Sequence, residues 1–374
     1  MARLLFLASR DIAHPQLAGG DIVMYRVASG LAHDGHEVRY FCSRHPGMSA
    51  EDRSDGMQII RVGNAFTTSP RFLLSRSRDA LHWSDAIVEE VIGGLRVPYL
   101  SGWFADLPHV CFWYQRNQLI FAAQYGPRLG LVLSRFESAV AKLYRDAIIL
   151  TLSEASKHDL VEMGLQGDRI RVCRPGIDKD LLRHATPLAG GREPTLVVIG
   201  KFRRYKRLEA TIVVLRRLHE LGIRDANLVI AGRREDERYR QELLDLARRL
   251  GVDEYVRIEC DITEERKAEL LRSARLLLIT SPIEGFGMTA IEANAFGVPV
   301  LATTGVPEDA VVEGSTGYRL PTGDIDAMAG KAARLLSSDA EWRSLSQNAA
   351  AFARNWTWDA TLDTVRSALR EIGI

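Results

Sequence analysis

The chain has 374 residues, which is too long for one ordinary hydrophobic core and fits two domains. Hydrophobic residues make up 46% of it and charged residues 26%, which is typical of a soluble globular protein. A formal net charge of +1 gives no support for a nucleic-acid partner, and no apolar run reaches the roughly 18 residues that span a bilayer.

The first residues and the cysteines bear on location and on metals. Residues 1–8 form an apolar run that Ser9, Arg10 and Asp11 end, which favours a buried first strand over a signal peptide. The four cysteines lie far apart with no C-x-x-C pair, so neither a zinc site nor a disulfide framework is indicated. We therefore expect a cytoplasmic protein without a bound metal, working either in solution or at the inner face of a membrane.

Short apolar runs alternate with helical patterns along the whole chain. In the first half, strands are expected at residues 4–8, 37–42, 58–62, 86–91, 110–114, 147–152 and 170–173. Helices are expected between them at residues 21–34, 127–144 and 154–163. Asp21 is expected to cap the first of these helices, and Gly35 to end it.

The second half repeats the alternation. Strands are expected at residues 195–199, 227–231, 255–258, 276–280, 298–302 and 317–320, and helices at 207–221, 237–250, 264–273, 288–296, 307–313, 325–337 and 340–355. Strands that alternate with helices imply βαβ units, and the near-continuous apolar strands imply sheets covered on both faces. The pattern therefore predicts an α/β fold with two Rossmann-like, doubly wound parallel-sheet domains whose edges face a ligand cleft.

The domain boundary is expected between residues 176 and 194. Residues 186–194 combine prolines, glycines and polar residues, which is a linker composition. The predicted division is a first domain at 1–185 and a second at 186–355, followed by a terminal segment at 356–374.

Residues 282–293, PIEGFGMTAIEA, are the most informative stretch of the chain. They place Glu284 and Glu292 around a Gly-x-Gly turn between an expected strand and an expected helix. A helix that opens after such a turn presents free backbone N–H groups to an anion, phosphate above all. Carboxylates accept hydrogen bonds from sugar or ribose hydroxyls, so the stretch indicates a nucleotide-sugar. A surface position for each glutamate, or an acid/base pair for glycoside hydrolysis, remains open from these residues alone.

Two further segments fit the same ligand. Gly19 and Gly20 follow the first strand and allow a close backbone approach, although an ordinary turn would look the same. The segment from Gly200 to Arg207 places five cations in eight residues directly after a strand, including Lys201 and Lys206. Cations at that edge of a sheet can neutralise a diphosphate, whereas a solvated basic loop is the alternative.

A basic segment with an apolar patch, residues 71–78, lies in the first half. It has the composition to touch an anionic membrane or an acceptor, and plain surface is the alternative interpretation.

Taken in order, these segments resemble the retaining family 4 glycosyltransferases of the GT-B fold, also called glycosyl transferases group 1. The resemblance covers nearly the whole chain. It rests on Gly19-Gly20 with residues 31–38, residues 153–156 with 170–178, residues 200–206, residues 284–292 with 297–300, and then Pro307-Glu308 and Gly317.

The resemblance implies a site and a reaction. Glu292 would bind the nucleotide ribose, Glu284 would face the donor sugar, and Lys206 and Lys201 would hold the diphosphate leaving group. The remaining donor-binding positions that it implies are Gly19, Gly20, Gly200, Gly285, Phe286, Gly287, Met288 and Thr289. A sugar would pass from a UDP- or GDP-type donor to an acceptor hydroxyl with retention and without a metal, and residues 356–374 would cross back to the first domain.

Two positions depart from the resemblance. Many relatives have arginine at the position of Lys201. The lysine keeps the positive charge but lacks the bidentate fork of the guanidinium group. Tyr114 stands where relatives often have a histidine. Tyrosine can hydrogen-bond a sugar but is a poor base near neutral pH, so Tyr114 is a candidate catalytic-site residue that need not act as a base. A nucleotide-sugar hydrolase or epimerase and a catalytically silent nucleotide-sugar-binding homologue therefore remain as alternatives. The acceptor could be a saccharide, a lipid-linked saccharide or a small molecule, with peripheral membrane contact left open.

Overall fold

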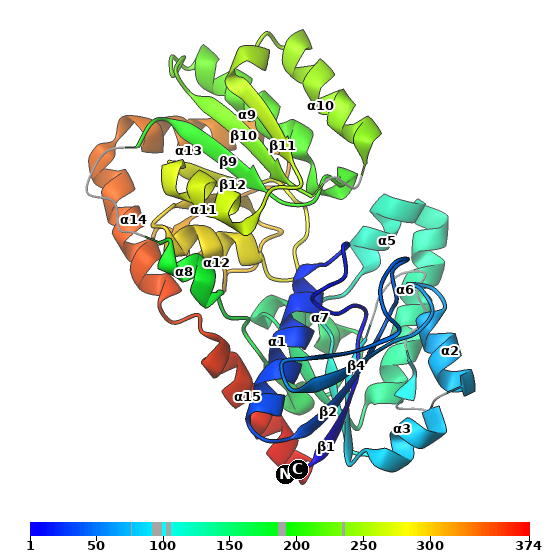
Figure 1. The fold of residues 1–374 in the computed structure, drawn as a ribbon. Helices are drawn as coiled ribbons and strands as arrows, with labels where there is room; N and C mark the ends of the chain where they lie inside the picture. Colours follow the sequence, from blue (N-terminus) through cyan, green and yellow to red (C-terminus); the bar gives the residue numbers. More distant parts are fainter. Residues whose placement is uncertain (76, 92–98, 102–105, 186–191, 234–235) are drawn as a thin grey trace. The chain divides into compact units, whose positions relative to one another are not determined.

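The computed structural model describes residues 1–374 apart from 76, 92–98, 102–105, 186–191 and 234–235. The chain divides into two compact units (Figure 1): Met1–Gly176 with Trp358–Ile374, and Ile177–Thr357. Residues 177–185, which the sequence places in the first domain, belong to the second compact unit. Most of the expected linker, residues 186–191, lies outside the described residues.

The first unit is built on an 8-stranded sheet in the order β3-β4-β2-β1-β5-β6-β7-β8. Its pairs are parallel, apart from the antiparallel pair of β3 with β4. The strands are β1 (Arg3–Leu7), β2 (Glu37–Cys42), β3 (Glu51–Ser54), β4 (Met57–Arg61), β5 (Ala86–Glu90), β6 (His109–Phe112), β7 (Ile148–Thr151) and β8 (Ile170–Val172).

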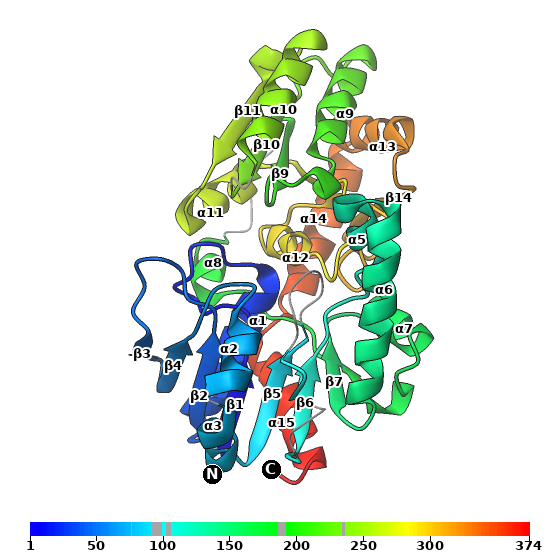
Figure 2. The same ribbon diagram turned by 90° about the vertical axis from the view of Figure 1, so that its right-hand side faces the viewer.

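Helices cover both faces of this sheet (Figures 1 and 2). They are α1 (Gly19–His33), α2 (Thr68–Ser75), α3 (Ser77–Trp83), α5 (Gln118–Tyr125), α6 (Pro127–Ala141), α7 (Glu154–Glu162) and α15 (Trp358–Glu371), with short 3₁₀ turns η1 (Lys142–Tyr144) and η2 (Gly167–Arg169).

The C-terminal helix α15 packs on α1 although the two are far apart in sequence. Gly30 of α1 allows a close crossing, because a Cβ atom there would collide with Leu362. Arg366 then forms a two-pronged ion pair with Asp34, at 2.7 and 2.8 Å. These contacts hold the end of the chain in the first unit.

The second unit has a 6-stranded parallel sheet in the order β11-β10-β9-β12-β13-β14. Its strands are β9 (Thr195–Ile199), β10 (Asn227–Gly232), β11 (Val256–Cys260), β12 (Leu276–Ile279), β13 (Val300–Thr303) and β14 (Gly317–Leu320). Its helices are α8 (Lys179–Arg183), α9 (Leu208–Glu220), α10 (Glu237–Arg249), α11 (Glu264–Ser273), α12 (Met288–Ala295), α13 (Ile325–Ser337) and α14 (Asp339–Ala353), with the 3₁₀ turns η3 (Arg204–Lys206) and η4 (Asp253–Tyr255).

The core of the second unit follows from simple sequence periodicity. Helix α9 buries Leu208, Ile212, Leu215 and Leu218, which recur every three or four residues and so share one face. They join a cluster that includes apolar residues of β9, β10 and β12. Strand β12 is buried along its whole length, as expected for a strand covered on both faces.

Both sheets reverse their strand order at one point. In the second unit the chain runs outward from β9 through β10 to β11, then returns beside β9 as β12 and runs outward through β13 to β14. In the first unit the equivalent neighbours are β1 and β5. Ligands of open α/β sheets bind outside the carboxyl ends of strands at such a reversal, so the loops after β9 and β12 are the expected ligand-binding loops of the second unit.

The predicted doubly wound α/β fold is confirmed, with local corrections. The helix expected at 307–313 is wrong: the bonds from Ala310 and Val311 to the Pro307 carbonyl close a turn, and the Val312 N–H goes to the Thr316 hydroxyl. Asp21 lies inside α1, which begins at Gly19, and its carboxylate accepts from the Ala18 N–H at 2.6 Å. The sequence missed the polar strand β3 and the short helices α2, α3, α5 and α8, which carry little periodicity.

No helix within the described residues is both long enough and apolar enough to cross a bilayer.

Strand β5 carries a fully buried carboxylate, Glu89. Tyr144 donates to it at 2.6 Å and Ser101 contacts it, while His109 lies 2.9 Å from the Ser101 hydroxyl. Burial raises the pKa of Glu89 to about 7, although the Ser101 and Tyr144 hydrogen bonds oppose that rise. The folded protein therefore binds an extra proton between about pH 4.5 and 7, and this group's contribution to stability falls as the pH rises through that window.

We predict that Glu89→Gln removes this pH dependence. The unfolding free energy of the variant, relative to the wild type, should increase from pH 5 to pH 8 by up to about 3 kcal/mol, measured by urea titration. Glu37→Gln, at an exposed carboxylate of the same sheet, should show no such trend. A constant difference between Glu89→Gln and wild type across this range would contradict the assignment.

Candidate functional site

Two loops meet at the strand reversal of the second unit. The first follows β9 and runs from Gly200 through η3 to Arg207. The second follows β12 and runs from Thr280 to Gly287, where α12 begins. Because β9 and β12 are neighbours in the sheet, their carboxyl ends bring the cation loop and the glutamate turn together.

Hydroxyl groups fasten the two loops to each other. The Thr280 hydroxyl lies 3.0 Å from the Lys206 carbonyl oxygen and 2.9 Å from that of Arg207, so its proton can be shared between them. The Glu284 N–H donates to the Gly305 carbonyl at 2.9 Å, and the Thr303 hydroxyl donates to the Ser281 carbonyl. These hydrogen bonds to backbone carbonyls hold the backbone of both loops, and so they help to position the side chains that the loops carry.

Lys206 and Glu284 form an ion pair at the centre of this arrangement. Their Nζ and Oε1 atoms are 2.5 Å apart, and the Ser281 hydroxyl donates to the same carboxylate oxygen at 2.5 Å. The two side chains are only 18% and 15% exposed. Burial lowers the pKa of Lys206, but the charges and hydrogen bonds of Glu284 and Tyr205 together outweigh it and the net shift is upward, so the ammonium stays charged.

The other cations of the loop do not all lie beside Glu284. Arg204 is exposed and pairs with Glu242 of α10 at 2.7 Å. Arg207 adopts a left-handed backbone (φ 52°) before α9, and its guanidinium lies 3.7 Å from Glu209. Lys201 lies half-buried at the start of the loop, and its carbonyl accepts from the Arg203 N–H. The cation cluster seen in the sequence thus separates into two exposed groups, Arg204 and Arg207, and three half-buried ones, of which Lys206 pairs with Glu284.

The turn before α12 has a conformation that suits glycine. Gly287 has φ 94° and precedes the first helical residue, Met288. A Cβ atom there would lie 3.1 Å from Val306. Phe286 is buried against Trp356, with ring centroids 5.1 Å apart, so its side chain anchors the turn to the residues before α15. No side chain caps α12, which leaves the N–H groups of its first turn, from Met288 and Thr289, facing the same end of the sheet.

Glu292 lies on α12 and pairs with a residue that the sequence did not single out. The Lys267 ammonium, on α11, is 3.0 Å from Glu292 Oε1 and 2.6 Å from Glu264. The Lys267 and Glu292 side chains are 13% and 14% exposed. Burial raises the pKa of the Glu292 carboxyl, and the Lys267 charge opposes the shift. The second candidate glutamate is therefore also held in a buried ion pair.

Two glycines outside the predicted set also shape the site. A Cβ atom on Gly232, at the end of β10 (φ 146°), would collide with the Gly200 carbonyl. A Cβ atom on Gly305 would collide with the Pro282 carbonyl. Their sequence signal is only a glycine next to a strand end, which many turns share. Both allow the loops to approach the neighbouring backbone closely.

The first unit holds the remaining candidates. Gly19 and Gly20 are the first residues of α1, and the Tyr114 hydroxyl donates to the Gly20 carbonyl at 2.9 Å. A Cβ atom on Gly20 would meet the Tyr114 ring at 2.5 Å. Burial raises the pKa of Tyr114 well above its ordinary value, so its hydroxyl stays protonated near neutral pH. Tyr114 thus supports the start of α1.

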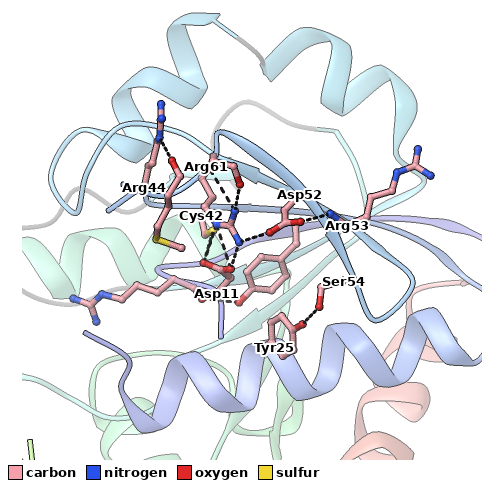
Figure 3. A network of polar contacts seen from close by, with 12 residues as sticks. Asp11, Tyr25, Cys42, Arg44, Asp52, Arg53, Ser54 and Arg61 are labelled. Atoms are coloured by element: carbon pink, nitrogen blue, oxygen red, sulfur yellow. Dashed lines mark hydrogen bonds and ion pairs between the residues drawn. The ribbon is translucent and has the colours of Figure 1, made fainter. Parts of the chain in front are cut away.

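A buried charge network holds the loop that leads from β1 to this glycine pair (Figure 3). Arg61 of β4 reaches Asp11 with its guanidinium, at 2.5 Å for the shortest contact, and also contacts Asp52 at 3.3 Å. The preceding residue, Arg10, pairs with Asp21 of α1 at 3.2 Å. Because these buried charges are paired, the polar loop that precedes α1 in the sequence can be buried.

We predict that Lys267→Met destabilises the protein by about 3 kcal/mol near neutral pH, because Glu292 becomes a buried charge without its nearest cation. The pKa of Glu292 then rises further, so the deficit relative to wild type should be larger at pH 8 than at pH 5. Urea titration at both pH values measures this. The double variant Lys267→Met/Glu292→Gln should recover most of the loss, whereas a deficit independent of pH would contradict the pairing.

Two family models match most of the chain in succession. Residues 17–181 match the model described as Glycosyltransferase Family 4, and residues 183–352 match Glycosyl transferases group 1. Curated relatives include the D-inositol 3-phosphate glycosyltransferases of Kribbella flavida, 29% identical over 59% of this chain, and Rhodococcus opacus, 30% identical over 60% of it. The matches span 56% and 53% of those proteins, or about half their length.

Solved structures share the fold over the full chain. Sucrose-phosphate synthase from Thermosynechococcus elongatus has a TM-score of 0.83 at 19% identity and covers 100% of this chain and 99% of that one. HepE from Anabaena, solved with UDP and glucose, has a TM-score of 0.76 at 15% identity and covers 99% and 100%. With two parallel-sheet units and the two consecutive family matches, the chain belongs to the family 4 glycosyltransferases of the GT-B fold.

Proposed function

We propose that this protein transfers a sugar from a nucleoside-diphosphate sugar to an acceptor hydroxyl, with retention at the anomeric carbon. The observation that carries the proposal is the buried Lys206–Glu284 pair at the strand reversal, beside the uncapped first turn of α12. An ammonium and helix N–H groups at one place suit a diphosphate, and a carboxylate beside them suits sugar hydroxyls.

In the proposed reaction the bond between the anomeric carbon and the diphosphate oxygen breaks, and the acceptor oxygen forms the new bond. The acceptor proton passes to the departing phosphate, so no protein base is required. Lys206, with Lys201 at the start of the same loop, stabilises the negative charge that develops on the leaving group. Such charge stabilisation is the task that a metal ion performs in other transferases, so we expect activity without one.

The two glutamates have separate roles in this proposal. Glu284 accepts hydrogen bonds from the donor sugar through the oxygen that does not contact Lys206 and Ser281. Glu292 accepts from the ribose hydroxyls, and the Lys267 charge favours its ionised form by opposing the rise in pKa that burial causes. The backbone from Phe286 to Thr289 contributes N–H groups to sugar and phosphate. Tyr114 supports Gly20 and takes no proton.

The neighbours and relatives support the choice of donor and the class of acceptor to test. Structures of HepE are described as complexes with UDP-glucose and with UDP and glucose. The curated relatives are named for D-inositol 3-phosphate. A UDP-sugar is therefore the first donor to test, with a GDP-sugar as comparison, and phosphorylated polyols, saccharides and lipid-linked saccharides are the acceptors.

The first test is a thermal-shift screen of UDP- and GDP-sugars, because a ligand that binds only the folded state raises its melting temperature. Donors that bind are then assayed for transfer with and without EDTA, and proton NMR reports the anomeric configuration of the product. Transfer with retention, unchanged by EDTA, is expected. Donor turnover without an acceptor would indicate a hydrolase or epimerase, and binding without turnover across the acceptor panel would indicate a silent homologue; either contradicts the proposal.

We predict that Lys206→Ala and Glu292→Ala each weaken donor binding or kcat/KM at least tenfold, about 1.4 kcal/mol. Arg204→Ala is the matched control, because it removes a cation of the same turn that pairs with Glu242 instead. Calorimetric titration with the bound donor measures the affinity, and melting temperatures confirm folding. Wild-type affinity and activity in both variants would remove these residues from the site.

A further inference from the structure

Helix α6 exposes an apolar face that the fold does not use. Leu129, Leu131, Val132 and Phe136 are 43%, 49%, 59% and 47% exposed, and Leu143, in the following turn η1, is 36% exposed. On most protein surfaces exposed large apolar side chains are scattered singly, whereas these five lie along one helix and the turn that follows it. In Figure 2, α6 runs along the outside of the first unit's sheet.

The inner face of α6 already has its partners. Val140 and Ala141 belong to the buried cluster around Trp113 and Tyr144. Gly130 faces α5 so closely that a Cβ atom there would meet the Ala122 backbone at 2.7 Å. At about 100° per residue, the exposed positions 128, 129, 131, 132, 135, 136 and 139 fall on one continuous arc opposite these contacts.

The charges on this arc have one sign. Arg128, Arg135, Lys142 and Arg145 are exposed along α6 and the turn after it. The only carboxylate between residues 127 and 145 is Glu137. It is buried and accepts from the Asn117 side chain at 2.6 Å, so it faces inward and does not neutralise the arc. Asp146, exposed directly after Arg145, is the next carboxylate along the chain, so the outward face combines large apolar side chains with an excess of positive charge.

We propose that this face of α6 docks onto the surface of an anionic lipid bilayer, with the helix lying in the plane of the headgroups. Apolar side chains would enter the headgroup–acyl boundary while the arginines and lysines contact lipid phosphates, which is how amphipathic helices of this composition bind. The flexible stems of Arg and Lys let the charges reach the headgroups without leaving the apolar surface.

Charge complementarity favours a lipid surface over a second copy of this chain. A twofold dimer would place the same patch opposite itself, so Arg128 and Arg135 of one copy would face the same cations of the other. An anionic bilayer supplies the opposite charge and an apolar layer together. This docking face differs from residues 71–78, the basic segment that the sequence suggested for membrane contact.

The test is co-sedimentation of the full chain with vesicles of phosphatidylcholine alone and of phosphatidylcholine containing about one third phosphatidylglycerol. Binding is expected only to the anionic vesicles and should weaken as salt is raised, since the Debye length shortens. The variants Val132→Ser/Phe136→Ser and Arg128→Glu/Arg135→Glu should each reduce the partition coefficient at least tenfold. Leu221→Ser, at a 49% exposed leucine of the second unit, is the matched control and should bind as the wild type does.

The readouts separate this proposal from the proposed function. The α6 variants should keep the melting temperature and the nucleotide-sugar affinity of the wild type, because these positions face outward. Equal binding of wild type and α6 variants to anionic vesicles, or no vesicle binding at all, would overturn the proposal. So would a concentration-dependent dimer, seen by light scattering, that both α6 variants abolish.

Discussion

The interaction on which the site depends is the ion pair between Lys206 and Glu284, buried where the strand order reverses. Removing two charges from water is costly, and well-packed apolar residues would often be as stable or more so. A pair that is kept at the ligand-binding edge of a sheet therefore points to a task beyond stability. The hydroxyls of Thr280 and Ser281 hold the backbone and the carboxylate so that both charges stay in place.

The second unit contains another lysine–glutamate ion pair of the same kind. Lys267 holds Glu292 as Lys206 holds Glu284, and each carboxylate keeps an oxygen beyond the one that its lysine contacts. Two partly buried carboxylates, each beside a lysine ammonium, can accept hydrogen bonds from hydroxyls, and an ammonium beside one of them can bind a phosphate. The proposed nucleotide-sugar site thus rests on two ion pairs and one helix start.

Much of this could be predicted from the sequence, because the signals are local. The apolar strands, the Gly-x-Gly turn, the loop positions of Lys206 and Glu284 after strands, and the place of Glu292 in the helix after that turn are all visible as short patterns. Lys267 was not found, since only the fold brings α11 to α12, and the roles of Gly232 and Gly305 depend on which backbone passes beside them. The expected helix at 307–313 failed because a threonine hydroxyl competes for a backbone N–H.

The most direct measurement is a crystal structure of the protein with UDP. We expect a diphosphate oxygen within hydrogen-bond distance of Lys206 Nζ, phosphate near the N–H groups of Met288 and Thr289, and ribose hydroxyls on the Glu292 carboxylate. UDP bound away from the loops that follow β9 and β12, with the Lys206–Glu284 pair untouched, would contradict this expectation.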